Sequence, residues 1–160
     1  MLIRTLFVFL AALTLSSSAF AETIIKSHAL TKVGEPKYEQ GFSRFEYTSA
    51  NATKGGEVRI AEIGGFDSLN YFIQKGLAER NCTLIYDSLM VRSADEPNTM
   101  YGLVAESVEY PEDRSWITFN LNTDAKFSDG KAITADDVKF TFDTLINHGD
   151  PVYKMYYTDV

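Results

Sequence analysis

Side chains that carry redox, metal-binding or nucleophilic chemistry are scarce in this chain of 160 residues. Cys82 is its only cysteine, and His28 and His148 are its only histidines. One cysteine cannot form a disulfide or a cysteine metal cluster within the sequence, and neither histidine has a partner at metal-ligand spacing. We therefore expect no bound metal and no cofactor. Cys82 is expected to be a buried, inert thiol, because free cysteine packs like a small hydrophobic residue.

Recognisable catalytic motifs are also absent from the sequence. It has no G-x-S-x-G nucleophile elbow, no H-E-x-x-H zinc motif and no glycine-rich phosphate loop. Asp136 and Asp137 are adjacent acids, but neighbouring side chains on a helix point about 100° apart. They are better explained as acids favoured by the dipole at a helix N-terminus than as a catalytic pair. The sequence therefore predicts no catalytic residues and no enzyme activity in this stretch.

Basic residues are outnumbered by acidic ones, 15 against 22, which gives the chain a formal net charge of −7. Nucleic-acid phosphates and anionic lipids attract basic surfaces, so neither is an expected partner. Apolar residues make up 45% of the chain and aromatic residues 13%, which indicates a folded protein rather than a disordered one.

The apolar run at the start of the chain, residues 6–15, is too short to cross a bilayer. One basic residue, Arg4, precedes it, and an A-x-A site follows it after three serines. This pattern predicts a signal peptide over residues 1–21, cleaved between Ala21 and Glu22, and a mature protein that is soluble in the periplasm. No cysteine ends the run, so a lipoprotein anchor is not expected. A membrane anchor or a buried helix is the alternative interpretation.

The mature chain divides into an arm and a domain by its periodicity. Residues 22–53 show no clean alternation and are expected to form an extended arm that lies over a surface. Residues 54–160 are expected to be the N-terminal part of an α/β domain of the mixed α+β kind. Its first half should contain a strand at 57–63, a loop, a helix at about 77–89 and a short strand that begins at Leu89.

The second half of the domain carries the clearest local signals. Residues 106–110 and 115–121 are expected to form a β-hairpin around a turn-rich tetrapeptide. Thr134, with Asp137 three positions later, is expected to cap a helix. The helix should end within residues 147–151, which contain glycine and proline. Its buried face should consist of Ala135, Val138, Phe142 and Leu145.

Two features indicate that the sequence is the N-terminal section of a longer protein. The expected strand at 57–63 has no partner of matching character nearby, and a lone strand leaves its backbone groups unpaired. The last residues, 153–160, which contain Tyr156 and Tyr157, also stop abruptly without a tail.

Several blocks of the sequence resemble one protein family, the family 5 extracellular solute-binding proteins, which are oligopeptide- and dipeptide-binding subunits of ABC importers. Residues 103–109 and 113–121 are similar to the family's hairpin, L-A-E-S-W-E followed by D-G-x-x-Y-T-F-x-L. Residues 125–142 resemble the family signature V-K-F-H-D-G-x-P-F-T-A-E-D-V-x-F-T-F nearly position by position. The family's first strand, following loop and first helix are similar to residues 54–61, 66–70 and 86–89.

Within this family the sequence is most similar to the Yej-type branch, whose members include importers of microcin C and of oligopeptides. Residues 34–38 in the arm and 113–116 in the hairpin carry this similarity. Tyr71 stands where many relatives have proline, and Ser128 where histidine is usual. These departures bear on the branch more than on the family.

The resemblance implies a monomeric periplasmic protein that captures a peptide or peptide-like ligand and delivers it to ABC transporter permease subunits. It implies a two-lobed fold of class II, incomplete in this chain, that closes on the ligand and holds the peptide backbone by strand-like hydrogen bonds. Other functions stay open, because a fold does not fix a function. They are a secreted hydrolase with catalytic residues beyond residue 160, a structural or signalling ectodomain, and a binding protein for a nickel complex, a heme-like molecule or a sugar.

The resemblance also implies where this chain would contact a ligand, at the mouth of the cleft between the lobes. The candidate ligand-binding residues are Phe66, Asp67, Asn70, Lys75, Gly76 and Leu77. Gly76 lets the backbone come close to a ligand, and Lys75 can meet a carboxylate. The alternative interpretation is that Asp67 and Asn70 only hold the turn by side-chain hydrogen bonds. Most ligand contacts are implied to come from residues beyond 160.

Overall fold

The computed structural model describes residues 23–159 as a mixed α/β chain, which confirms the predicted class. Its strands form two antiparallel sheets, with the orders β1-β5-β6 and β2-β4-β3. The strands are β1 (Ile24–Ser27), β2 (Ala29–Thr31), β3 (Met90–Arg92), β4 (Thr99–Gly102), β5 (Ala105–Pro111) and β6 (Thr118–Leu121). The expected signal peptide, residues 1–21, and its cleavage site between Ala21 and Glu22 lie outside the described residues.

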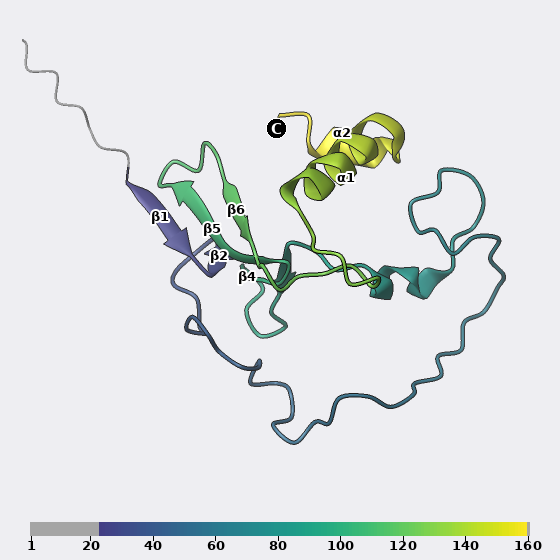
Figure 1. Ribbon diagram of the computed structural model, residues 1–160, viewed down its shortest axis with the longest axis horizontal. Coiled ribbons are helices and arrows are strands. Elements are labelled where there is room, and N and C mark those ends of the chain that lie inside the picture. Colours follow the sequence, from purple (N-terminus) through teal and green to yellow (C-terminus); the bar gives the residue numbers. More distant parts are fainter. Residues whose placement is uncertain (1–22, 160) are drawn as a thin grey trace, which may run out of the picture.

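The helices lie away from the sheets. They are the 3₁₀ helix η1 (Arg80–Ile85) and the α-helices α1 (Ala135–His148) and α2 (Pro151–Tyr156). Figure 1 shows α1 and α2 side by side on one flank of the molecule, and a long segment after β2 that loops out before the chain returns to η1. Every helix within residues 23–159 is too short or too polar to cross a bilayer.

The core lies on both faces of the sheet β2-β4-β3. On one face Ala29 and Tyr101 pack with Tyr38 of the arm. On the other face Met90 packs against Val108 of the second sheet. Adjacent residues of a strand point to opposite faces, so β2 and β4 each contribute residues to both clusters. The two sheets and the arm therefore form a layered unit, with the β2-β4-β3 sheet in the middle.

The predicted arm needs a correction at its start. Residues 24–27 pair antiparallel with β5, with Ile24 opposite Pro111, and residues 29–31 pair with β4. The partner strands lie far along the sequence, and pairing across such a distance leaves no local alternation to detect. After Thr31 the arm is irregular, and Phe42 and Phe45 pack on the buried cluster around Tyr101.

The strand predicted over residues 57–63 is wrong for the described chain. These residues have no regular structure and are exposed, with Val58 and Ile63 leaving 85% and 95% of their surface in solvent. Alternating apolar residues give a segment the capacity to pair, but a strand forms only where another strand supplies the hydrogen bonds.

The helix predicted over residues 77–89 is also wrong in length and type. Only residues 80–85 are helical, as the 3₁₀ helix η1, which Glu79 caps by accepting from the N–H of Asn81 at 2.8 Å. Tyr86 is extended and ends the helix. Cys82 is buried, as predicted, and burial raises the pKa of its thiol. The short strand expected from Leu89 is present as β3, one residue later.

The hairpin and the capped helix are confirmed. β5 and β6 pair antiparallel, with Val108 opposite Phe119. Thr134 and Asp137 form a reciprocal capping box, in which the Asp137 carboxylate accepts from the backbone N–H of Thr134 at 2.8 Å. The predicted buried face of α1 is not buried within the described chain. Phe142, for example, is 36% exposed and packs edge-on against Tyr157 at 5.4 Å between ring centroids.

Candidate functional site

The predicted ligand-contact residues lie on one loop, residues 66–77, which is closed at its base. The N–H of Asp67 donates to the carbonyl of Leu77 at 3.0 Å, and Asp67 Oδ1 accepts from the N–H of Leu77 at 2.8 Å. The N–H of Glu79 donates to the carbonyl of Ser68 at 2.9 Å and continues the closure. The structure therefore brings the two halves of the predicted set together.

Gly76 is required by the loop itself. Its φ is +96°, a conformation that residues with a side chain rarely adopt. A β-carbon on Gly76 would also lie only 2.6 Å from Asp67 Oδ1. The glycine and the aspartate thus fit one another at the base of the loop, and this close fit accounts for glycine at this position.

Asn70 also shapes the loop, because its Oδ1 accepts from the N–H of Phe72 at 3.0 Å. The remaining members of the predicted set point outward. Phe66 and Leu77 are 58% and 57% exposed, and Lys75 is exposed as well. An aromatic ring, an aliphatic side chain and an ammonium group are therefore held on a closed loop, where they are free to contact a ligand.

The loop is tied to the C-terminal helices by one side chain. The amide of Gln74 donates to the carbonyl of Gly149 at 2.7 Å and also to the carbonyl of His148. These carbonyls belong to the end of α1, where backbone acceptors have no partner inside the helix. Gln74 therefore fixes the position of the loop relative to α1, and it was not singled out from the sequence.

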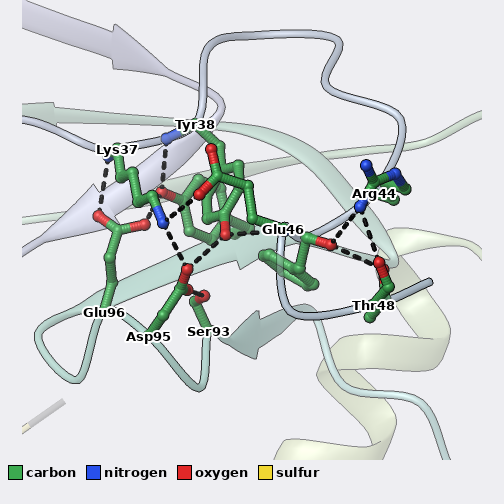
Figure 2. A network of polar contacts seen from close by, with 10 residues as sticks. Lys37, Tyr38, Arg44, Glu46, Thr48, Ser93, Asp95 and Glu96 are labelled. Carbon is green, nitrogen blue, oxygen red and sulfur yellow. Dashed lines mark hydrogen bonds and ion pairs between the residues drawn. The ribbon is translucent and has the colours of Figure 1, made fainter. Parts of the chain in front are cut away.

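Sequence reasoning also missed a polar network that fastens the arm to the β3–β4 loop (Figure 2). The ammonium of Lys37 lies 2.7 Å from Asp95 Oδ2 and 2.7 Å from Glu46 Oε2. The Tyr38 hydroxyl donates to Asp95 Oδ2 at 2.5 Å. The N–H of Lys37 donates to Glu96 Oε1 at 2.8 Å. Arm and loop lie almost 60 positions apart in sequence, so no local spacing signals this network.

The contacts of the network shift the pKa values of Lys37 and Asp95 so that both groups stay charged. The hydrogen bond with Asp95 is the main cause that raises the pKa of Lys37, and the hydrogen bond with Lys37 holds the pKa of Asp95 well below its usual range. Burial, followed by the hydrogen bond to Glu96, raises the pKa of Tyr101 to about 12. Shifts in these directions keep Lys37 protonated and Asp95 ionised at neutral pH, so the ion pair is kept. The network is a structural clamp.

Within residues 23–159, no three His, Cys, Asp or Glu side chains are placed to hold a metal ion. His28 Nε2 lies 2.8 Å from the carbonyl of Tyr38. Since a carbonyl only accepts, this nitrogen carries the proton and is used in packing the arm.

Comparison with known proteins agrees with the resemblance seen in the sequence. Residues 99–160 match the family model "Bacterial extracellular solute-binding proteins, family 5 Middle". The chain is 37% identical to the uncharacterized protein YejA of Escherichia coli over 98% of its own length. It is 40% identical to the peptidoglycan-binding protein YepA, and 39% identical to the probable peptide-binding protein YejA, both of Agrobacterium fabrum, over 95% and 94% of its length.

The chain spans about a quarter of the length of these curated relatives. The matched region includes the hairpin strand β6 and the capped helix α1, which carried the resemblance in the sequence. The names of the relatives and of the family indicate a binding role. The chain belongs to the family 5 bacterial extracellular solute-binding proteins and is of the Yej type.

Proposed function

We propose that this chain is part of a periplasmic binding protein that captures a peptide or peptide-like ligand and passes it to the permease of an ABC importer. The observation that carries the proposal is the identity of 39% to a relative named a probable peptide-binding protein, across nearly all of this chain. The first residues of the sequence support export, because an apolar run at 6–15 followed by an A-x-A site is typical of a signal peptide. The protein would act as a monomer.

We further propose that the loop 66–77 contributes to the ligand site through its outward side chains. Lys75 would meet a peptide carboxylate, while Phe66 and Leu77 would cover apolar parts of the ligand. Asp67, Asn70 and Gly76 would act indirectly, because their contacts lie inside the loop. Contacts that recognise backbone and a single charge suit a protein that accepts many peptide sequences.

The experiment is ligand identification followed by titration. Full-length protein purified from the periplasm is unfolded, and the released small molecules are analysed by mass spectrometry. Peptides support the proposal, whereas a nickel complex, a heme-like molecule or a sugar would overturn it. Incubation with the same peptides separates binding from hydrolysis, since a binding protein returns them intact.

Titration calorimetry then tests the loop. Trialanine binding to K75A should be weakened by about tenfold, which corresponds to about 1.4 kcal/mol. The control is K139A, because Lys139 is exposed and, among residues 23–159, its ion pair is with Asp143 of the same helix. Equal affinities for K75A and K139A would remove the loop from the site.

Peptidoglycan fragments are a second ligand class, favoured by the identity of 40% to a relative named a peptidoglycan-binding protein. Their stem is itself a short peptide, so both classes share the chemistry proposed for the loop. Titration of a disaccharide–tetrapeptide fragment beside the free tetrapeptide distinguishes them. Tighter binding of the intact fragment assigns the sugar part a role in recognition, and equal binding assigns recognition to the peptide.

A further inference from the structure

A small cleft of about 250 Å³ lies in the described part of the chain. It is formed by β1 and β2, by residues 34–36 of the arm, by the end of β5 and by the turn after it. Its lining contains no residue of the loop 66–77. Ile25 and Tyr110, which lie directly opposite one another in the β1–β5 pair, give the cleft an apolar side.

Arg114 stands at the edge of this cleft in an unusual backbone conformation. Its φ is +56°, and within residues 23–159 it is the only residue other than glycine with a positive φ. Its N–H donates to the carbonyl of Pro111 at 3.0 Å and closes the turn. Its guanidinium donates to the carbonyl of Thr31, another lining residue, at 2.9 Å. A turn position that favours glycine is thus occupied by a residue whose side chain is aimed at the cleft.

The cleft has charges of both signs that are not paired with each other. Arg114, Glu35 and Glu112 all line it, and none of them forms an ion pair with another side chain in the described part of the chain. The Thr31 carbonyl uses one of the five N–H groups of the guanidinium. N–H donors of Arg114 and the carboxylates of Glu112, from the same turn, and of Glu35, from the arm, therefore remain available around one small, partly apolar cavity.

A complementary ligand must carry a carboxylate and an ammonium group and be small. We propose that this cleft binds a small zwitterion, a free α-amino acid or a dipeptide, with its carboxylate on Arg114 and its ammonium on Glu35 and Glu112. The planar guanidinium suits a carboxylate because it presents parallel N–H groups. The apolar side of Ile25 and Tyr110 takes a small side chain. This site is separate from the proposed ligand loop and does not depend on it.

The test is a titration of L-alanyl-L-alanine into full-length protein labelled at isoleucine methyl groups. Ile25 lines the cleft, so its methyl resonance, assigned with I25V, reports binding there and not elsewhere. We expect a saturable shift of this resonance in the wild type. In R114G the dissociation constant at Ile25 should rise at least about tenfold, or about 1.4 kcal/mol. Glycine accepts the positive φ, so R114G keeps the turn.

R114G also removes the hydrogen bond to the carbonyl of Thr31, so a second variant is needed to test the charges of the cleft separately. E112Q removes one charge without removing a described contact, and it should also weaken binding severalfold. N-acetyl and C-terminal amide forms of the dipeptide, which each lack one charge, should bind the wild type more weakly than the zwitterion. K139A should leave the Ile25 titration unchanged. Absence of a saturable Ile25 shift in the wild type, or an R114G dissociation constant within about twofold of the wild type, would overturn the proposal.

Discussion

The hydroxyl of Tyr101 accepts a hydrogen bond at 3.1 Å from the backbone N–H of Tyr38, 63 positions earlier in the chain. The same hydroxyl donates to the carboxylate of Glu96. Both tyrosines are buried, at 1% and 6% exposure, and their rings meet edge-on at 5.6 Å. One side chain of β4 thus binds the arm by a backbone contact and by packing, and this joint holds the arm against the sheet.

Removing the Tyr101 hydroxyl should loosen the arm. In Y101F the buried N–H of Tyr38 loses its acceptor, and an unsatisfied buried donor costs about 1–3 kcal/mol. We expect a loss of this size in the free energy of unfolding of the full-length protein, measured by urea denaturation. Y47F is the matched control, because Tyr47 is half exposed and its hydroxyl accepts only a long hydrogen bond, at 3.4 Å from Ala94. Similar losses for the two variants would contradict the role given to Tyr101.

The clamp between Lys37 and Asp95 should give stability that depends on pH. The hydrogen bond from Lys37 depresses the pKa of Asp95 in the folded state, so the unfolded chain binds more protons than the folded chain in acid. The stabilisation is fully present above the pKa of an unfolded aspartate, about 3.9, and is lost as the pH falls toward the lower folded value.

D95N should therefore be less stable than the wild type at about pH 7, and the difference should shrink as the pH falls below about 4. Denaturation midpoints at a series of pH values measure this. D87N serves as the control, because Asp87 is exposed and forms no ion pair with another side chain in the range 23–159. A D95N difference that stays constant from neutral to acid pH would argue against the clamp.

The cap of α1 makes a local and separable contribution. The Thr134 hydroxyl accepts from the N–H of Asp137, and replacing such a cap with alanine costs about 0.5–2 kcal/mol. T134A should lower the free energy of unfolding by this amount, as measured by thermal or urea denaturation. T141A should be nearly neutral, because Thr141 lies on the exposed side of the same helix and alanine is the better helix former. An equal effect of the two changes would show that the cap adds nothing.

Elements with local signals were the ones that the sequence predicted correctly. The hairpin β5–β6 and the Thr134 cap depend on residues within about a dozen positions of each other, and their turn and cap residues are specific. β1 and β2 were missed because their partners lie in β5 and β4, far along the chain. The strand expected at 57–63 was wrong for the opposite reason. Its apolar residues alternate, but within residues 23–159 no strand pairs with it.

The conformation of the candidate loop was also predictable only where its contacts are local, and its role in ligand binding stays a prediction. The resemblance located the loop 66–77, and turn chemistry anticipated that Asp67 and Asn70 hold it. The contact between Gln74 and Gly149 joins residues 75 positions apart, and the contact between Lys37 and Asp95 joins residues 58 positions apart. Contacts of this kind arise when separate elements pack together, so composition and spacing carry no trace of them.

The last prediction concerns the fit between Gly76 and Asp67. In G76A the new methyl group would lie 2.6 Å from Asp67 Oδ1, and φ would have to stay at +96°. Either the base of the loop opens or the strain is kept, at roughly 1–2 kcal/mol for the backbone conformation alone. G65A is the matched control, because a β-carbon on Gly65 meets nothing within 4 Å and its φ is not in the strained range.

We expect G76A to weaken both the folding of the loop and the binding of trialanine, while G65A changes neither. The double variant D67A/G76A separates the two causes. Without the carboxylate the clash is gone, so adding G76A to D67A should cost less than adding it to the wild type, and the remainder measures the backbone strain. Hydrogen exchange at the N–H of Leu77, which donates to Asp67, reports opening of the loop directly. If G76A protects this N–H as well as the wild type does, then Gly76 is not needed to close the loop, and its proximity to Asp67 has no consequence for the site.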